Sequence, residues 1–375
     1  MIPGLDGLRG IAFLLIFLVH TDFINFGWAG VQLFFVLSGF LITGILVDMK
    51  RGLPQGAYFI KFYGRRFLRI FPLYYFYLAF AFILSIALFN FGALSKKMEL
   101  FWQHLPYALT FTYNFFYVVA KEPSMLLSHF WTLSVEEQFY VFWPLLIFLT
   151  PEKSYRKLFL GAIAFGVLFR VGFTLACQVF SFSFAQGGVA HAVYPLTLSH
   201  MDAFGMGAYL SLNKIPKSTR QFTVLTFLVP AIGFAANYLA TGSAAPIHTL
   251  GYPYLMENAY QFIWGYVLLN YWFMVTIDAV VRENLFRRVL TWKPLAYLGK
   301  ISYGLYVYHL GTIFLIYRLV GPLVKFPPPW PHLTLAVLEF AVTLGLASLS
   351  YRFLEKPLLN FKDKYFALPK EVHGN

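Results

Sequence analysis

The sequence contains one cysteine and few charged residues. Cys177 has no second cysteine to pair with, so a disulfide framework and a cysteine-based metal site are both excluded. Only 12% of the 375 residues are Asp, Glu, Lys or Arg. Water-soluble domains carry about twice that share, roughly 25%. The scarcity of charge therefore excludes a soluble globular protein of this size.

Several chemical signatures are missing as well. No glycine-rich loop leads into Lys and Ser or Thr, which argues against nucleotide hydrolysis. His191, His200 and His248 lack metal-ligand spacing, so we expect no metal. The basic residues are dispersed along the chain and form no groove-sized patch, so we expect no nucleic-acid partner. Nothing in the sequence suggests a second soluble domain.

Long apolar runs dominate what is present. Hydrophobic residues make up 59% of the chain, aromatic residues 21%, and the mean hydropathy is +0.64. A helix needs about 20 apolar residues to cross a bilayer, so about ten spans fit the length. We therefore predict an all-α, polytopic transmembrane helical bundle. The expected spans are 9–24, 29–49, 71–90, 134–150, 158–178, 196–212, 222–240, 256–279, 296–319 and 333–354.

Two apolar segments, 9–24 and 104–120, each allow two interpretations. Segment 9–24 has no small-residue cleavage site after it, and a second span follows at once, so we interpret it as a retained helix rather than a signal peptide. Segment 104–120 is apolar but short, and it contains Thr110, Thr112 and Asn114. We interpret it as re-entrant or interfacial, because an eleventh crossing would reverse the side of every later loop.

The positions of Lys and Arg predict the orientation. If the N-terminus is cytoplasmic, 22 of the 29 basic residues fall in cytoplasmic segments, and the opposite side keeps Lys96, Lys97, Lys121 and Lys325. This bias is what the positive-inside rule predicts for an even number of spans with both termini in the cytoplasm. Residues 1–355 are then a membrane domain and 356–375 a cytoplasmic polar tail. Most of the net charge of +13 thus reports topology.

Arg9 and His20 form the first candidate constellation. They are eleven positions apart, which in a helix is three turns plus about 20°, so both lie on one face, separated by about 16 Å along the axis. A neutral imidazole can take a proton from a hydroxyl near neutral pH, as acyl transfer to an alcohol requires. A structural histidine bonded to a neighbouring helix is the alternative.

A basic cluster precedes the third expected span. Arg66 and Arg69 are three positions apart and would share a helix face, where two guanidinium groups suit bidentate contacts to phosphate. The alternative is a positive-inside anchor that meets anionic lipid headgroups.

A third constellation lies at the start of the fourth expected span, in residues 131–140, Trp-Thr-Leu-Ser-Val-Glu-Glu-Gln-Phe-Tyr. Acidic side chains at the threshold of an apolar helix are costly unless they have partners or a function, which draws attention to Glu136. Interfacial placement, with Trp131 and Tyr140 in an aromatic belt, is the alternative.

Further ionisable residues lie in or near the spans, and pairing for structure explains most of them as well as catalysis does. They are Asp6, Asp22, Arg170, Asp202, Lys300, His309 and Arg318. Ser302, Tyr306 and His309 share a helix face through their spacing of four and three.

Six motifs in the same order resemble the integral-membrane acyltransferase 3 family. They occupy residues 4–10 with His20, 34–42, 66–72, 131–140, 302–306 with His309, and 352–357. Each motif alone is degenerate, but the six in sequence are specific, and the resemblance extends from residue 4 to about residue 358.

The resemblance implies an enzyme that moves an acyl group, usually acetyl, from cytoplasmic acyl-CoA to a hydroxyl of a carbohydrate or related acceptor. The family's Arg-x10-His pair falls on Arg9 and His20, its Arg-x-x-Arg pair on Arg66 and Arg69, and its motif glutamate on Glu136. Acyl-CoA would be a substrate, with no permanently bound cofactor.

The combined expectation assigns two kinds of site. His20 and Glu136 would be catalytic, with His20 either a general base or the acceptor of the acyl group itself, and Arg9, Arg66 and Arg69 would bind acyl-CoA. The residues expected to bind or orient the acceptor are Asp22, Asn114, Trp131, Tyr306 and His309. Asp202 is carried over only weakly, because no arginine precedes it directly.

The acceptor is open between exopolysaccharide, O-antigen, a lipid-linked precursor, peptidoglycan and a small molecule. Membrane lipids and glycan-biosynthesis proteins are the other expected partners. A glycan or lipid transporter is the competing hypothesis, although we find no internal pseudo-repeat, which transporters commonly show. A purely structural membrane scaffold is the third.

Overall fold

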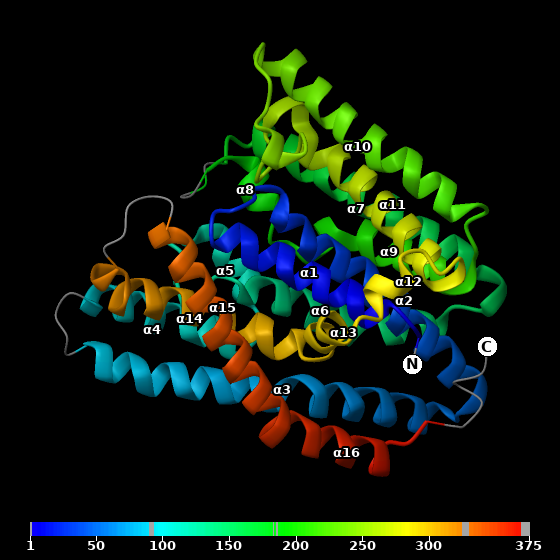
Figure 1. Ribbon diagram of the computed structural model, residues 1–375. Coiled ribbons are helices and arrows are strands. Elements are labelled where there is room, and N and C mark those ends of the chain that lie inside the picture. The colour runs from blue at the N-terminus through cyan, green and yellow to red at the C-terminus, as the bar shows by residue number, and fades with distance from the viewer. Residues whose placement is uncertain (1, 90–93, 183, 185–186, 325–329, 369–375) are drawn as a thin grey trace. The chain divides into compact units, whose positions relative to one another are not determined.

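The computed structural model describes residues 2–89, 94–182, 184, 187–324 and 330–368. Asn90, which ends the third expected span, two of the counted cations, Lys325 and Lys370, and the end of the expected tail lie outside this part. All regular structure in the described residues is helical (Figure 1), which confirms the predicted all-α class. The chain divides into two compact units, residues 1–47 with 135–300 and residues 48–134 with 301–375.

The first unit takes the N-terminal helices and the central third of the chain. Its α-helices are α1 (Leu5–His20), most of α2 (Ala29–Gly52), most of α6 (Phe130–Leu149), α7 (Tyr155–Val179), α8 (Val189–Val193), α9 (Met201–Leu212), α10 (Ser218–Thr241), α11 (Gln261–Arg282), α12 (Arg287–Leu290) and α13 (Lys293–Lys300). Short 3₁₀ turns connect them at η1 (Phe26–Trp28), η3 (Glu152–Ser154), η4 (Thr197–His200), η5 (Ile247–Thr249) and η6 (Asn258–Tyr260).

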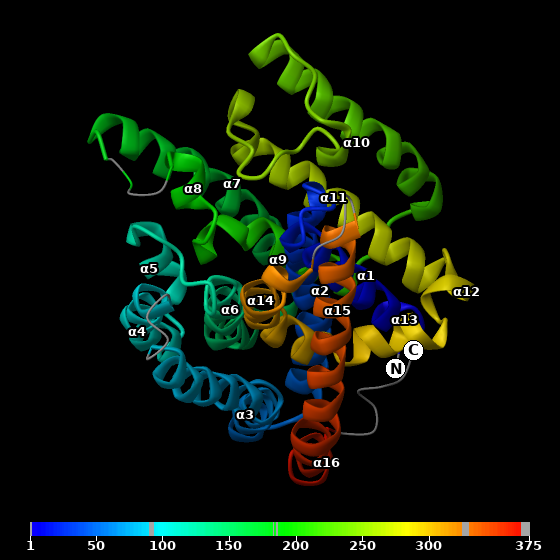
Figure 2. The same ribbon diagram turned by 60° about the vertical axis from the view of Figure 1, so that its left-hand side comes forward.

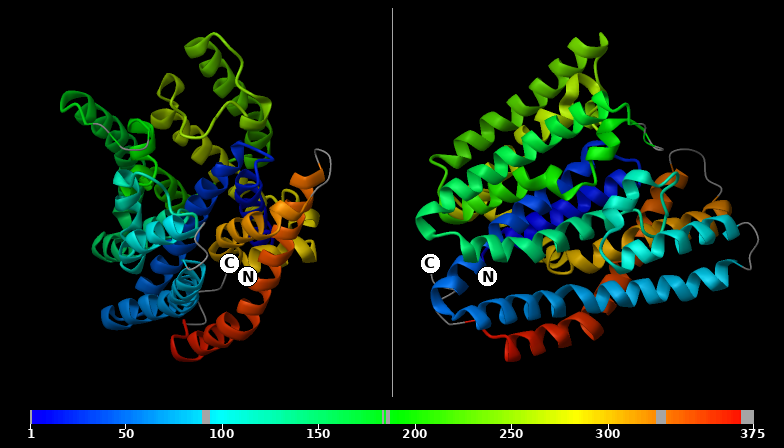
Figure 3. Two further views of the ribbon diagram at one scale, coloured as in Figure 1. Left: turned by 90° about the vertical axis from the view of Figure 1, so that its left-hand side faces the viewer. Right: turned by 180° about the vertical axis from the view of Figure 1, so that it is seen from behind.

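The second unit joins two distant parts of the sequence. Besides the end of α2 and the start of α6, it contains α3 (Gln55–Phe89), α4 (Ser95–Leu109), α5 (Tyr113–Val119), α14 (Ser302–Leu319), η7 (Gly321–Leu323), α15 (Trp330–Ser350), a π-helical turn η8 (Tyr351–Glu355) and α16 (Lys356–Tyr365). In it, α14 packs along α15 (Figure 2) and α16 packs along α3 (Figure 3).

Seven helical segments in the described part of the chain are long and apolar enough to cross a membrane. They are Phe26–Gly52, Gln55–Phe89, Glu152–Val179, Ser218–Thr241, Asn258–Arg282, Ser302–Leu323 and Trp330–Tyr365. The three other expected spans also fall on helices. However, α1 has 16 residues, α9 has 12, and α6 carries Glu136, Glu137 and Gln138 in its first half. An integral membrane protein with several spanning helices is therefore supported.

The ambiguous segment 104–120 is not one continuous helix. It covers the end of α4 and all of α5, and the two are separated at Phe111, whose φ of 53° lies in the left-handed region. Neither α4, with 15 residues, nor α5, with 7, reaches the length of a span.

A glycine allows close packing between α1 and α13 in the first unit. A Cβ atom on Gly299 would lie 1.6 Å from the Asp6 carbonyl oxygen, so only glycine fits there. The start of α1, which carries Arg9, is thereby held against α13.

Candidate active site

The helix α1 presents Arg9 and His20 as the sequence predicts, because Leu5–His20 is one uninterrupted helix. Arg9 lies in its second turn, where Nη1 is 3.4 Å from Asp6 Oδ1 and the side chain is 22% exposed. His20 is the last helical residue, and its side chain is exposed. Asp22 follows in the turn after the helix with a φ of 57°, also exposed. The imidazole and the Asp22 carboxylate therefore belong to the same end of α1.

Glu136 has a partner from a second motif. Ser38 Oγ of α2 donates to Glu136 Oε1 at 2.7 Å, and the Tyr140 hydroxyl is 3.3 Å from Ser38 Oγ. Because the single Ser38 proton goes to the carboxylate, the Tyr140 hydroxyl donates to Ser38. The motifs at 34–42 and 131–140 thus meet in one chain of hydrogen bonds that fixes the Glu136 carboxylate. Sequence reasoning missed Ser38, although it lies inside a quoted motif.

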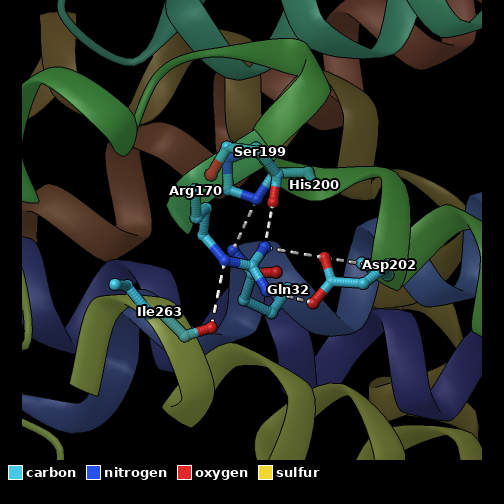
Figure 4. A network of polar contacts seen from close by, with 7 residues as sticks. Gln32, Arg170, Ser199, His200, Asp202 and Ile263 are labelled. Atoms are coloured by element: carbon cyan, nitrogen blue, oxygen red, sulfur yellow. Dashed lines mark hydrogen bonds and ion pairs between the residues drawn. The ribbon is translucent and has the colours of Figure 1, made fainter. Parts of the chain in front are cut away.

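A second polar network lies deeper in the first unit (Figure 4). Arg170 of α7 makes two hydrogen bonds to Asp202 of α9, at 3.0 and 2.7 Å, and both side chains have 0% exposure. Arg170 also donates to the carbonyl oxygens of Ser199 and Ile263. Each guanidinium nitrogen of Arg170 and each carboxylate oxygen of Asp202 has a partner in this pair or in the backbone, so Asp202 has the geometry of a structural ion pair.

His200 belongs to the same network. Its Nε2 donates to the Tyr194 carbonyl at 2.7 Å, which leaves Nδ1 to accept a hydrogen bond from Gln32 Nε2 at 3.1 Å. The His200 ring is fully buried, and its centre lies 4.9 Å from the centre of the Phe35 ring. The tautomer is therefore set by two neighbours, which is how a structural histidine is held.

Arg66 and Arg69 lie on α3 in the second unit, in a stretch that hydropathy alone did not include in the span. The Arg66 guanidinium is 5.8 Å from the centre of the Phe62 ring, and both arginines are half-buried. They share a helix face, as the spacing predicts.

The C-terminal helix joins this basic surface. Arg65 contacts Asp363 at 3.2 Å and the Phe366 carbonyl at 3.0 Å, and Lys362 lies 3.3 Å from the same Asp363 oxygen. Close approach is possible because Gly64 has no side chain, since a Cβ atom there would lie 2.3 Å from the Phe366 ring. Arg65 and Lys362 thus lie beside Arg66 and Arg69. The spacing of residues in the sequence did not assign these two cations to the basic surface.

Three more motif segments converge in the second unit. The Tyr303 hydroxyl of α14 donates to the Ile70 carbonyl of α3 at 2.7 Å. On the other face of α14, a Cβ atom at Gly304 would lie 3.2 Å from Glu355 Oε1 of η8. The motifs at 66–72, 302–306 and 352–357 therefore form one packed cluster.

Tyr306 and His309 lie in a buried group with His129. The hydroxyls of Tyr306 and Thr132 are 2.6 Å apart, and both reach the His129 carbonyl, at 3.1 and 2.9 Å. His129 Nε2 donates to Val307 O at 3.1 Å, His309 Nδ1 donates to Tyr306 O at 2.6 Å, and the two imidazole rings are 4.9 Å apart. The sequence analysis did not select His129, which directly precedes Phe130, the first residue of α6.

The two remaining predicted acceptor residues are buried in the same unit. Asn114 on α5 has 0% exposure and Trp131 on α6 has 6%. No group of three or more His, Cys, Asp or Glu residues with metal-binding geometry occurs in the part of the chain that the structure describes.

Comparison with known proteins identifies the family. The acyltransferase 3 family model, described as an acyltransferase domain, matches residues 2–352. The chain belongs to this family. The resemblance drawn from the six motifs is thereby confirmed.

Relatives of this acyltransferase 3 chain include OatA proteins of two bacteria. It is 28% identical to the O-acetyltransferase OatA of Staphylococcus aureus over 389 residues, which cover 99% of this chain and 59% of that protein. It is 28% identical to the peptidoglycan O-acetyltransferase OatA of Listeria monocytogenes over 403 residues, with 98% and 59% covered. The chain thus spans about three fifths of the length of these relatives. No solved structure gives a significant match.

Proposed function

We propose that this protein is a membrane O-acetyltransferase that moves an acetyl group from cytoplasmic acyl-CoA to a hydroxyl of a cell-envelope glycan. The observation that carries the proposal is the family match over residues 2–352, together with relatives that are named O-acetyltransferases. The family match favours this enzyme over a transporter or a scaffold, because neither alternative explains why the six motifs occur together.

In the proposed orientation the chain crosses a bacterial cytoplasmic membrane ten times, and both termini lie in the cytoplasm. Three of the ten spans, on α1, α6 and α9, would be short or polar helices, and the other seven would be the longer apolar ones. Buried polar groups such as the Arg170 and Asp202 pair are tolerated inside a bundle because they satisfy each other.

Donor binding is assigned to the basic surface of α3 with help from Arg9. Coenzyme A carries several phosphate charges, and guanidinium groups bind phosphate through two parallel hydrogen bonds. Arg66 and Arg69 would hold these phosphates from the cytoplasmic side, which agrees with the excess of positive charge predicted for that side.

His20 would act as the general base. Its imidazole takes the proton of the acceptor hydroxyl, the hydroxyl oxygen attacks the thioester carbonyl, the C–S bond breaks, and the coenzyme A thiolate leaves and recovers the proton. A covalent route, in which His20 first carries the acyl group, uses the same residue. Glu136, held by Ser38, would orient the base or the acceptor.

Acceptor positioning is assigned to the remaining predicted residues, Asp22, Asn114, Trp131, Tyr306 and His309. The name of the Listeria relative points to peptidoglycan as one acceptor. We propose a sugar hydroxyl of peptidoglycan, exopolysaccharide, O-antigen or a lipid-linked precursor, because each carries such hydroxyls.

The direct test supplies the purified protein with acetyl-CoA and peptidoglycan fragments or other envelope glycans. We expect free coenzyme A to appear together with a glycan that is heavier by one acetyl group, and the same mass to be missing from the glycans of cells that lack the gene. The proposal would be refuted if none of these acceptors gave coenzyme A release or a changed glycan mass.

Donor recognition is tested separately. R66A/R69A should weaken acetyl-CoA binding, because two charge-assisted contacts to phosphate are lost. R156A/K157A is the matched control, since Arg156 and Lys157 are exposed cations at the start of α7. Unchanged donor affinity in R66A/R69A would remove the phosphate role.

A further inference from the structure

A groove between α10 and α11 has the features of a phospholipid site. It has a volume of about 400 Å³ and lies entirely within the first unit. Its walls consist of Pro216, Lys217, Arg220, Gln221, Val224, Leu225 and Tyr271. Ligand-binding cavities typically have volumes of about 300–1,000 Å³, so the space suits a headgroup with the first part of its chains.

The groove changes character along one face of α10. Lys217 and Arg220 lie at the start of the helix, and Val224 and Leu225 follow one turn later on the same face. Between them, the Tyr271 hydroxyl donates to Gln221 Oε1 at 2.8 Å and joins the two helices at this point. The site is therefore cationic at one end and apolar at the other.

Neither cation has a counter-ion among the residues that the structure describes. The Lys217 and Arg220 side chains form no ion pair or hydrogen bond within the described residues, and both are exposed. The Glu283 carboxylate accepts hydrogen bonds from the backbone N–H groups of Ser218 and Thr219, at 2.9 Å each. Arg282 next to it is already paired with Asp278. Neither groove cation is therefore held by a carboxylate in the described part of the chain.

The surroundings select a lipid over a soluble anion. α10 is one of the seven helices with the length and apolarity of a span, and only 17% of its apolar window is buried within the protein. Val224 is 54% exposed on that surface. An unpaired cation pair at the end of an apolar, outward-facing helix is the arrangement that attracts anionic lipid headgroups.

We propose that this groove binds an anionic phospholipid, with the phosphate held by Lys217 and Arg220 and the acyl chains lying along Val224 and Leu225. The site is separate from the residues assigned to acyl transfer, and it does not depend on that activity. Bound lipid would fix α10 against α11 at the surface of the first unit.

The test measures lipid retention by native mass spectrometry of the purified full chain with dioleoylphosphatidylglycerol. K217Q/R220Q should retain it roughly thirty-fold more weakly, the combined effect expected for two cations near an anionic surface. K153Q/R156Q is the control, because Lys153 and Arg156 are equally exposed and unpaired in the described structure but do not line this groove, and it should bind like the wild type.

Three outcomes would overturn the proposal. Unchanged retention by K217Q/R220Q would show that the groove cations do not hold the lipid. Equal retention of zwitterionic dioleoylphosphatidylcholine would show an apolar surface without headgroup recognition. Displacement of the lipid by millimolar inorganic phosphate or glycerol 3-phosphate would show a site for soluble phosphate. Thermal unfolding of each variant, expected to match the wild type, excludes misfolding as the cause.

Discussion

His20 is the residue on which the proposed chemistry depends most. A general base typically contributes about 10²–10⁴ in rate, so His20→Ala should lower acetyl transfer by at least two orders of magnitude. His248→Ala, at an exposed loop position, should leave the rate unchanged. The measurement is coenzyme A release by purified protein with an intact thermal unfolding profile. Near-normal turnover of a folded His20→Ala protein would show that another group takes the proton.

Asp202 illustrates the opposite kind of residue, one whose contacts explain it without chemistry. Asp202→Asn removes the charge that balances the fully buried Arg170, and uncompensated buried charges typically cost about 3–5 kcal/mol. We therefore expect a clearly lower thermal unfolding temperature in detergent. R170M/D202L, which removes both charges, should recover part of the loss. If Asp202→Asn abolished transfer but left unfolding unchanged, Asp202 would belong to the reaction.

At the scale of elements, the sequence predicted where helices lie better than where they end. All ten expected spans fall on helices, because apolar windows of bilayer length almost always fold that way. The third was expected to begin at residue 71, yet α3 begins at Gln55, since hydropathy cannot detect a helix that continues through Arg65, Arg66 and Arg69.

The sequence motifs select candidate site residues, but the contacts of these residues could not be predicted from the sequence. The motifs identify Glu136 and Arg66, but Ser38 is 98 positions from Glu136, and Asp363 is almost 300 from Arg65. Such contacts depend on tertiary packing, which spacing within one helix does not report. For the same reason, the segment expected as a polar tail contains α16, which packs along the arginine-bearing half of α3.

The α4 and α5 pair should respond to pH through His104. Burial lowers the pKa of His104 from 6.5 to about 4, and its Nδ1 lies 2.8 Å from the Tyr113 hydroxyl. A histidine with a lowered pKa in the folded state stabilises that state fully above pH 6.5, and the contribution is lost as the pH falls towards 4. The rate of amide hydrogen exchange in residues 95–119, corrected for intrinsic rates, should therefore rise as the pH falls from 6.5 to 4.

Substitution of His104 separates this effect from destabilisation of the whole protein by acid. In His104→Gln the exchange of residues 95–119 should no longer change between pH 6.5 and 4, whereas His248→Gln should behave like the wild type. Exchange that is independent of pH in the wild type would contradict the assignment.

For the whole molecule, the motifs sort into two groups. Those at 34–42 and 131–140 meet around Glu136 in the first unit, and those at 66–72, 302–306 and 352–357 pack together in the second. The assigned base His20 and Arg9 lie in the first compact unit, whereas Arg66 and Arg69 lie in the second. Each unit builds its own share of the chemistry from segments far apart in the sequence.

The orientation of the whole chain can be tested with its single cysteine removed. In a Cys177→Ser background, K97C and S243C should react with a membrane-impermeant maleimide on intact cells, because their segments are predicted to face outward. K153C and R288C should react only after permeabilisation, because the positive-inside rule places these cations in the cytoplasm. Reaction of both K97C and K153C on intact cells would mean that the chain crosses the membrane an even number of times between them, so that segment 104–120 crosses together with α6 or neither of them crosses. In either case the even span count with both termini in the cytoplasm would be wrong.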